Sequence, residues 1–325
     1  MLSRGDLTDA EWAVLAPLLP TSNNRCGRWR DHRQVINGII HRLSTGCQWR
    51  KLPERFGAWQ TVHKRHQLWS ADGTWARMLQ HVQAVADAED AIDWNINVGS
   101  TSIRAHQHVA GANSPATHAV QRLKRGQRSV HLPRTGARSH APVSVPGGGG
   151  AAGEALGRSR GGLTTKIHMA ADGRCRPLSL IITPGHRADC TQFDQVLEKI
   201  RVPRLGLGRP RRLPDSIGAD RAYSNGVIRA YLRRRGIRHV IPEKSDSKSA
   251  RLRKGSRGGR PPGFDKTRYK ARNTVERAVN KLKQFRAVAT RYDKRGYVSL
   301  GTVTAAALLI WLRSLSMPRS IRLLR

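Results

Sequence analysis

Glu276 is the position with the clearest chemical meaning in the sequence, because it is a single carboxylate in a cationic stretch. At about 100° per residue of an α-helix, four side chains share a stripe roughly 60° wide: Tyr269, Arg272, Glu276 and Lys283. A carboxylate held rigidly among cations suits a metal ion that meets a phosphate backbone. The same spacing also describes an Arg272–Glu276 pair at i,i+4, a common solvated ion pair. Geometry alone leaves both interpretations open.

Asp220 is a second candidate for the same chemistry. It follows a short apolar segment, residues 215–219, that is typical of a β-strand. A carboxylate at a strand end faces the crevice where α/β sheets bind ligands. Asp220 and Glu276, with no His or Cys partner, are hard oxygen ligands that suit Mg²⁺ or Mn²⁺. Two such ions about 3.5–4 Å apart could stabilise an in-line displacement at a phosphodiester. A strand-end Asp is also often a simple turn former.

The charge of the chain points to a polyanionic partner. The 325 residues include 59 Lys and Arg against 22 Asp and Glu, for a formal charge of +37. Each cation that neutralises a phosphate releases a counterion, so a charge of this size favours binding to nucleic acid. Arg outnumbers Lys, which favours bidentate phosphate contacts but equally fits a GC-rich genome. Charge alone does not distinguish DNA from RNA.

Cysteine usage and hydropathy give no sign of a zinc site or a membrane span. The four cysteines show no CxxC pair, and we expect them to be reduced thiols. We expect no signal peptide and no membrane partner. The apolar run 305–312 is shorter than the ~20 residues of a span and predicts a buried C-terminal helix.

Residues 1–90 are predicted to form a small helical domain. Thr8 and Glu11 have the spacing of a capping box, and a second helix is indicated by apolar residues on one face of 35–43. A third helix, near 58–69, carries Lys64 and Arg65. Three short helices with a basic third one suit a helix-turn-helix-like reader of DNA. A plain helical scaffold accounts for the same pattern.

The remainder is predicted to be α/β. Residues 91–112 hold a first strand near 96–104, and residues 113–153 are an irregular basic insertion that we expect to be mobile. Residues 154–325 alternate strands with helices. Strands are expected at 162–170, 177–183, 215–219 and 238–242, helices at 189–200 and 225–235, and a basic loop at 251–263. This pattern predicts a mixed sheet flanked by helices.

The order of several motifs resembles the bacterial insertion-sequence transposases of the DDE class. The carrying segments are LTDAEWAVLAPLLP, TGCQWRKLPERFGAWQTV, RAHQH, GRSRGGLTTKIH, GADRAY and RNTVERAVNKLKQFR. The spacing of Tyr269, Arg272, Glu276 and Lys283 is similar to the signature of that class. The resemblance covers nearly all of the chain except 113–153.

This resemblance implies a fold, a site and a set of partners. The fold would be a ribonuclease-H-like catalytic core behind a small all-helical N-terminal domain. The site would be an Asp-Asp-Glu triad with two Mg²⁺ or Mn²⁺ ions, to which Asp220 and Glu276 belong. Tyr269, Arg272 and Lys283 would position DNA phosphates, and Lys64 and Arg65 would contact DNA from the N-terminal domain. The partners would be transposon terminal repeats and target DNA, bound by a homodimer in the bacterial cytoplasm at the nucleoid.

The sequence departs from the family pattern at the first triad position. That Asp belongs five residues before Arg104, in a Val-Asp-Ser-Thr context, and Gly99 stands there. No Asp or Glu occurs between Asp93 and Glu154. At ~3.3 Å per residue Asp93 lies roughly 20 Å away along a strand, so it cannot replace the missing ligand. We therefore expect impaired cleavage.

Three functions remain for the structure to separate. The first is a DDE transposase, active or impaired. The second is a catalytically dead DNA-binding relic that represses active copies. The third is an unrelated basic RNA-binding protein, which composition permits but which leaves the carboxylates and the motif order unexplained.

Overall fold

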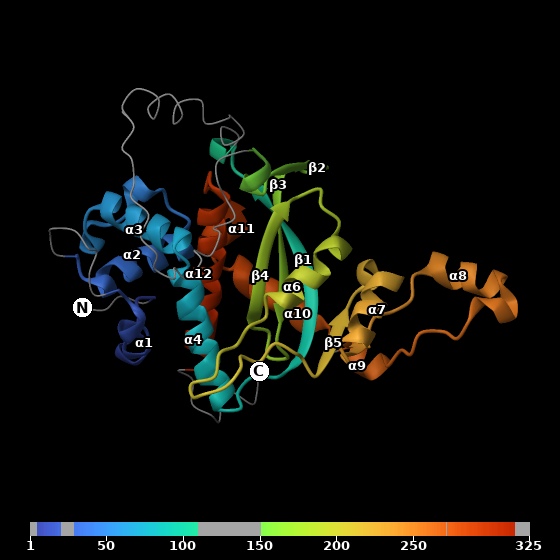
Figure 1. The fold of residues 1–325 in the computed structure, drawn as a ribbon. Helices are drawn as coiled ribbons and strands as arrows, with labels where there is room; N and C mark the ends of the chain where they lie inside the picture. The colour runs from blue at the N-terminus through green and yellow to red at the C-terminus, as the bar shows by residue number, and fades with distance from the viewer. Residues whose placement is uncertain (1–4, 21–28, 110–150, 271, 316–325) are drawn as a thin grey trace, which may run out of the picture.

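A mixed sheet forms the centre of the molecule (Figure 1). The computed structural model describes residues 5–20, 29–109, 151–270 and 272–315. The strands are β1 (Asn95–Ala105), β2 (Gly157–Ser159), β3 (Gly162–Ala171), β4 (Pro177–Pro184), β5 (Ser216–Ala219), β6 (Arg238–Val240) and β7 (Thr290–Arg291). β1, β3 and β4 are antiparallel neighbours, whereas β5 runs parallel to β1 and β6 runs parallel to β5. The expected mixed sheet of a ribonuclease-H-like core is confirmed.

Helices cover both faces of this sheet. α6 (Phe193–Glu198) lies in front of the strands in Figure 1, and α10 (Asn273–Lys283) lies behind them. α7 (Gly226–Arg234) connects β5 to β6, and its N-cap is Asn225, whose Oδ1 accepts a hydrogen bond from the Ile228 amide. The short helix α11 (Arg286–Ala289) and the strand β7 then lead to α12 (Gly296–Leu315).

The N-terminal helices pack on the C-terminal helix rather than standing apart. They are α1 (Asp9–Leu15), α2 (His32–Thr45), α3 (Trp59–Ala71) and α4 (Thr74–Ala88). The predicted capping box at Thr8 is present, and Gly46 ends α2 with a positive φ of 68°, a conformation that glycine adopts without strain. One hydrophobic cluster runs from Leu7 to Leu312, so these helices and the sheet share a core.

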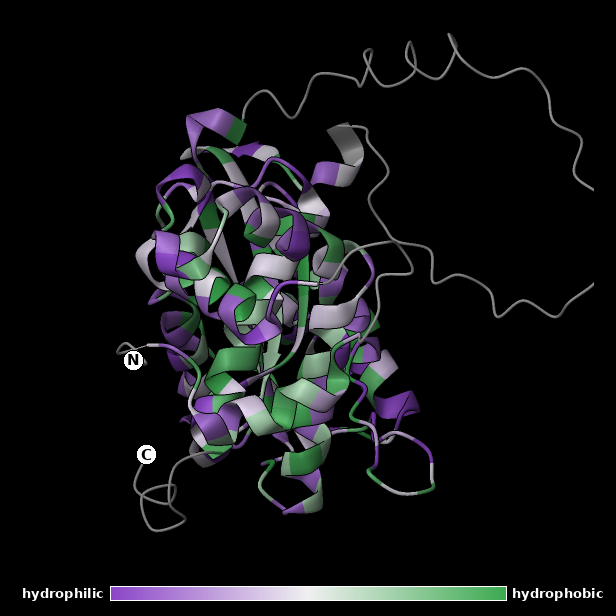
Figure 2. Ribbon diagram, turned by 90° about the vertical axis from the view of Figure 1, so that its left-hand side faces the viewer, coloured by the Kyte–Doolittle hydropathy of each residue, from purple (hydrophilic) through white to green (hydrophobic). Residues whose placement is uncertain are grey.

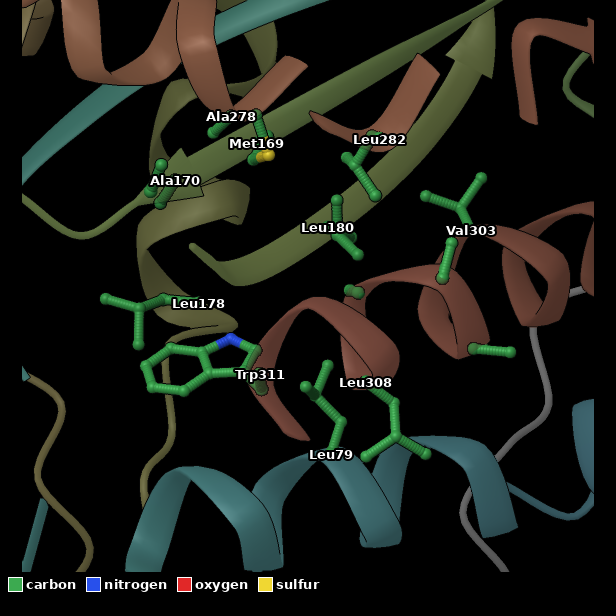
Figure 3. Packing of buried hydrophobic residues seen from close by; sticks show 14 of the residues in the cluster. Leu79, Met169, Ala170, Leu178, Leu180, Ala278, Leu282, Val303, Leu308 and Trp311 are labelled. Carbon is green, nitrogen blue, oxygen red and sulfur yellow. The ribbon is translucent and has the colours of Figure 1, made fainter. Parts of the chain in front are cut away.

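α12 is the element that joins the two parts. It is longer than the predicted run, at 20 residues with a mean hydropathy of 1.6 in its most apolar window, and 72% of that window is buried inside the protein. Figure 3 shows Trp311 and Leu308 of α12 beside Leu79 of α4, with Leu180 of β4 on the other side of α12. Figure 2 shows the whole molecule turned by 90°, with hydrophobic segments mostly toward the middle of the fold and hydrophilic ones mostly toward its outside. The apolar surface of α12 therefore forms the middle of the core.

Two expectations about local structure are wrong. The segment 251–263 is not a plain loop, because α8 (Ser245–Arg253) and a 3₁₀ turn (Gly255–Gly258) occupy most of it. The stretch from Tyr269 to Lys283 is not one helix, because α9 (Lys266–Lys270) ends before α10 begins. A stripe calculated for a continuous helix therefore does not include Tyr269. The insertion 113–153 lies outside the described residues, except for its last three residues, where a 3₁₀ turn (Ala151–Glu154) begins.

Acid is expected to destabilise the fold through His66. This side chain is 0% exposed, and its Nε2 lies 3.0 Å from Thr302 Oγ1 of α12. Burial lowers the pKa of His66 from 6.5 to about 3. Because the folded pKa lies below the unfolded one, the unfolded state binds the proton first, and stability is lost as pH falls below about 6.5. Between pH 7.5 and 5 the loss should be about 2 kcal/mol for this group.

Urea unfolding at these two pH values measures this contribution. A His66→Gln variant removes the titrating group, so its loss of stability between pH 7.5 and 5 should be smaller by about 2 kcal/mol, whatever its absolute stability. An identical loss in the variant and the parent would mean that other groups cause the acid sensitivity. His168 gives a second contribution of the same sign, because burial lowers its pKa to about 4.

Candidate active site at β1, β5 and α10

The register of the sheet brings Gly99 and Asp220 together. β1 and β5 are parallel, and Val98 pairs with Ala219 at the last position of the ladder. Gly99 and Asp220 are the next residues along the two strands. Ligand sites in such sheets lie at the carboxyl ends of parallel strands. The position that the family pattern reserves for an Asp is therefore next to the one Asp that the chain retains there.

Gly99 also faces the helix that carries Glu276. A Cβ atom built on Gly99 would lie 3.0 Å from Val275 Cγ2, and Val275 directly precedes Glu276 on α10. Two residues earlier on the same face of β1, Asn97 Nδ2 donates a hydrogen bond of 2.6 Å to Thr274 Oγ1. A side chain at position 99 would consequently point toward the start of α10.

Asp220 is held at the start of a turn. Its Oδ1 accepts a hydrogen bond of 2.8 Å from the Ala222 amide, so it caps the 3₁₀ turn Arg221–Tyr223. This capping is the ordinary role of a strand-end Asp. The side chain is half-buried, so the second oxygen is available for another ligand while the first remains a cap.

Glu276 lies in the first turn of α10 and is paired with Arg272. Arg272 Nη2 lies 2.6 Å from Glu276 Oε1, with the two side chains 25% and 55% exposed. Partial burial lowers the pKa of Arg272, but the hydrogen bond and charge of Glu276, with the charge of Asp220, outweigh burial and leave that pKa raised. Arg272 thus responds to both carboxylates, and a cation that binds Glu276 Oε1 must displace it.

The other two members of the predicted signature flank this site. The Tyr269 ring, on α9, has its centroid 5.6 Å from Arg272 Cζ. Lys283, at the end of α10, has its Nζ 3.5 Å from the Ser102 carbonyl oxygen of β1. Cations therefore stand at both ends of α10, with Glu276 between them, where a phosphate backbone could lie across β1.

Lys64 and Arg65 lie on α3, outside the candidate active site, and have different environments. Lys64 is exposed, whereas Arg65 is 9% exposed. The Arg65 guanidinium stacks on Trp29, with Cζ 3.4 Å from the ring centroid, and its Nη1 lies 2.9 Å from His32 Nδ1. The structure gives Arg65 a packing role and leaves Lys64 as the side chain that faces solvent.

The donors at this site are two carboxylates, Asp220 and Glu276. Within the described ranges there is no group of three or more His, Cys, Asp or Glu side chains placed to hold a metal ion. Two hard oxygen donors fit one cation that keeps several waters. The position at which the family pattern has a third carboxylate is occupied by Gly99.

Sequence reasoning did not identify Asn97, Val275 or Gly218 as part of this site. Asn97 ties β1 to α10, and a Cβ on its strand partner Gly218 would lie 2.1 Å from Asn97 Oδ1. Period-2 alternation places Asn97 on the same face as Gly99, and this signal could have identified it. No pattern in the sequence indicates the contact between Val275 and position 99.

Comparison with known proteins identifies the family of the chain. A family described as the transposase DDE domain matches residues 100–311, and a family described as transposases of the IS4/5 group matches residues 7–79. A protein from Brucella ovis named as the transposase for insertion sequence element IS6501 is 30% identical over 151 residues, which cover 46% of this chain and 100% of that protein. A 16.2 kDa protein of insertion element IS402 from Burkholderia cepacia is 36% identical over 107 residues, which cover 30% of this chain and 73% of that protein.

Two solved structures resemble the chain at a much lower level. The Mos1 transposase paired-end complex with the left transposon end has a TM-score of 0.23 and 11% identity over 91% of this chain and 82% of that one. A pre-cleavage Mos1 transpososome has a TM-score of 0.21 and 9% identity over 92% and 83%. Values this low add nothing to the fold assignment, which rests on strand order and polarity. The two family matches carry the conclusion that this chain is a member of the DDE transposase family of insertion sequences.

Proposed function

We propose that this transposase binds the duplex ends of its element and that its strand cleavage and transfer are impaired by Gly99. The observation that carries the proposal is the register of the sheet. In this register Gly99 is next to Asp220, and a Cβ atom at position 99 would face α10, the helix of Glu276. A glycine there removes one carboxylate from the centre of the site and leaves the surrounding elements in place.

The DDE family implies a divalent metal ion, and the donors of this chain favour Mg²⁺ or Mn²⁺. Asp220 and Glu276 would hold it, and it would supply Lewis-acid stabilisation at the scissile phosphate. Arg272 would turn from Glu276 toward a phosphate oxygen, with which it can form a bidentate contact. Tyr269 and Lys283 would position the same backbone from either side. An intact site would hold two ions, and this chain lacks the ligand for the second.

DNA binding is supported by an exposed face of α3 and by a basic segment near α8. On α3, Gln60, Lys64 and Leu68 are exposed at i, i+4 and i+8 and form a solvent face. The segment 244–270 carries ten Lys or Arg against two Asp, and its helix α8 has no buried residue and projects away from the sheet in Figure 1. We assign end recognition to the α3 face, nonspecific affinity to the 244–270 segment, and a homodimer to the complex on DNA.

Substitutions on α3 should reduce the preference for element ends. We expect Gln60→Ala with Lys64→Gln to lower the ratio of affinities for terminal-repeat and random duplexes by about tenfold, as loss of a base contact does. Fluorescence anisotropy over a salt series measures this ratio. Lys248→Gln on α8 is the matched control, and it should weaken both duplexes equally and lower the salt slope by about one.

If the α3 variant kept the parent's preference for terminal-repeat over random duplexes, this face would not be the one that recognises element ends. Point substitutions are preferable to deletion of residues 1–90, because these helices share a core with α12. Deletion would expose that core and confuse lost recognition with lost folding.

A second function, repression by a catalytically dead copy, is favoured by the same glycine. A chain that occupies element ends without cleaving them would compete with active copies. The two functions differ in whether the chain as it stands nicks end-containing DNA.

A further inference from the structure

The segment between α6 and β5 forms a basic hairpin with an apolar tip (yellow, between these elements in Figure 1). Val202 and Arg211 pair in antiparallel fashion through two backbone hydrogen bonds of 3.0 and 2.9 Å. These bonds close an eight-residue loop, 203–210, that begins and ends with a proline. The two prolines restrict the backbone, so the loop is preorganised to present its tip.

The base of the hairpin is anchored to the protein, whereas the tip is not. Val202 is 0% exposed, and Arg211 lies with its Cζ 4.1 Å from the ring centroid of Trp94. Arg211 Nη2 also lies 2.8 Å from Asp215 Oδ1. At the tip, Leu207 is 103% exposed and Leu205 is 56% exposed. Such leucines contribute nothing to the core of this chain.

The surroundings of these leucines are cationic. Residues 201–214 contain five arginines and no acidic residue. Arg204 directly precedes Leu205, Arg209 follows Leu207 by two residues, and both arginines are exposed. A second copy of such a surface would be repelled by it, whereas phosphates on both sides of a groove would be attracted. Charge complementarity therefore favours nucleic acid over another copy of this basic chain.

We propose that this hairpin, residues 202–211, is a minor-groove wedge. Leu205 and Leu207 insert between base steps, and Arg204 and Arg209 contact the phosphates that line the groove. Apolar side chains between basic ones are the means by which minor-groove proteins unstack and kink duplex DNA. This inference rests on the proposed function, since it requires that the chain bind duplex DNA.

The position of the hairpin separates its ligand from the scissile phosphate. Trp94 and Asp215, which hold its base, directly precede β1 and β5, whereas Gly99 lies five residues farther along β1 and Asp220 directly follows the end of β5. The hairpin would hold duplex DNA that flanks the cleavage position. A kink at this point would direct the flanking duplex along the basic surface.

Unstacking of 2-aminopurine in a 30-base-pair duplex, together with end-to-end FRET on the same duplex, tests the proposal. With A·T-rich DNA the full chain should increase 2-aminopurine fluorescence and shorten the end-to-end distance. Leu205→Ser with Leu207→Ser should abolish both signals. Affinity should fall only about three- to tenfold, because leucine burial offsets much of the unstacking cost in the parent.

Two further variants distinguish insertion of the leucines from the effect of charge and from the effect of any exposed apolar side chain. Arg204→Gln with Arg209→Gln should lower the salt slope by about two and weaken binding. Val227→Ser, at an 80% exposed apolar position on α7, should leave fluorescence and FRET unchanged.

Three other outcomes would contradict the wedge or the proposed function. If the leucine variant distorts DNA as the parent does, the wedge is wrong. If it instead changes the oligomeric state without DNA, measured by light scattering, the tip is a protein interface. If the parent fails to bind any duplex, the proposed function fails as well, so the two failures are distinguishable.

Discussion

Replacement of Gly99 by Asp is expected to raise Mg²⁺- or Mn²⁺-dependent nicking of element-end DNA by about 1000-fold or more. Loss of one member of a catalytic constellation typically costs at least this factor. The new carboxylate would stand beside Asp220 and face the helix of Glu276. It would complete the ligand set for a second metal ion. Affinity for Mn²⁺, measured by electron paramagnetic resonance, should rise in the same variant.

The side chain of Val275 decides how complete the rescue is. A Cβ at position 99 would lie 3.0 Å from Val275 Cγ2 and 3.2 Å from Cγ1, so Val275 must move by a few tenths of an ångström. Crowding of this size in a packed site is destabilising. We therefore expect Gly99→Asp with Val275→Ala to nick DNA at least as fast as Gly99→Asp alone.

Two controls separate the carboxylate from its steric effect. Gly99→Ala adds the same Cβ without charge and should give no gain. Gly99→Asp with Glu276→Gln should remain inactive, whereas metal-free DNA binding should be equal in all variants because Arg and Lys supply the phosphate contacts. Full nicking activity in the parent chain would show that another group replaces the missing Asp. It would also contradict the second function, repression by a catalytically dead copy. If Gly99→Asp and Gly99→Asp with Val275→Ala both fold but do not nick DNA, the defect lies outside position 99.

Asp293→Asn is expected to destabilise the protein by about 3–5 kcal/mol, because it leaves a guanidinium buried without its counter-ion. Arg42 of α2 pairs with Asp293 at 3.1 Å, and the two side chains are 3% and 6% exposed. Asp293 Oδ2 also accepts a hydrogen bond of 2.7 Å from Thr302 of α12. Burial raises the pKa of Asp293, but the charges and hydrogen bonds around it outweigh burial and keep that pKa lowered.

Thermal and urea unfolding measure this loss, for which we expect a Tm lower by about 10 °C. Asp9→Asn is the matched control, since Asp9 pairs with Arg33 at 2.6 Å but is 86% exposed, and it should cost less than about 1 kcal/mol. Arg42→Met with Asp293→Leu removes both charges and should recover much of the stability. A cost below about 1 kcal/mol for Asp293→Asn would show that Arg42 finds water or another partner.

Apolar periodicity predicted the elements that bury a face and missed those that do not. The strands at 162–170 and 177–183 and the helix at 225–235 were identified within two residues, because alternation and capping residues mark them. α8 was missed because none of its residues is buried, so no apolar pattern reveals it. The break between α9 and α10 was missed because the cationic residues there suit a helix and a turn equally.

For the candidate site, the sequence offered residues but not their contacts. Motif spacing predicted Asp220, Glu276 and position 99 as its members, and the register of β1 with β5 puts position 99 next to Asp220. Arg65 was expected at a DNA surface because cations are usually exposed. Its stacking on Trp29 depends on a residue 36 positions away, and such a contact exists only after the chain has folded.

The burial of α12 between the N-terminal helices and the sheet has a consequence for synthesis on the ribosome. Domains generally fold in the order in which they emerge, but α3 and α4 cannot complete their packing until residues 296–315 have been made. The region assigned to end recognition therefore matures last, although it is translated first. A nascent or truncated chain would leave apolar helix faces open to chaperones and proteases, and DNA would meet only chains whose catalytic core is already finished.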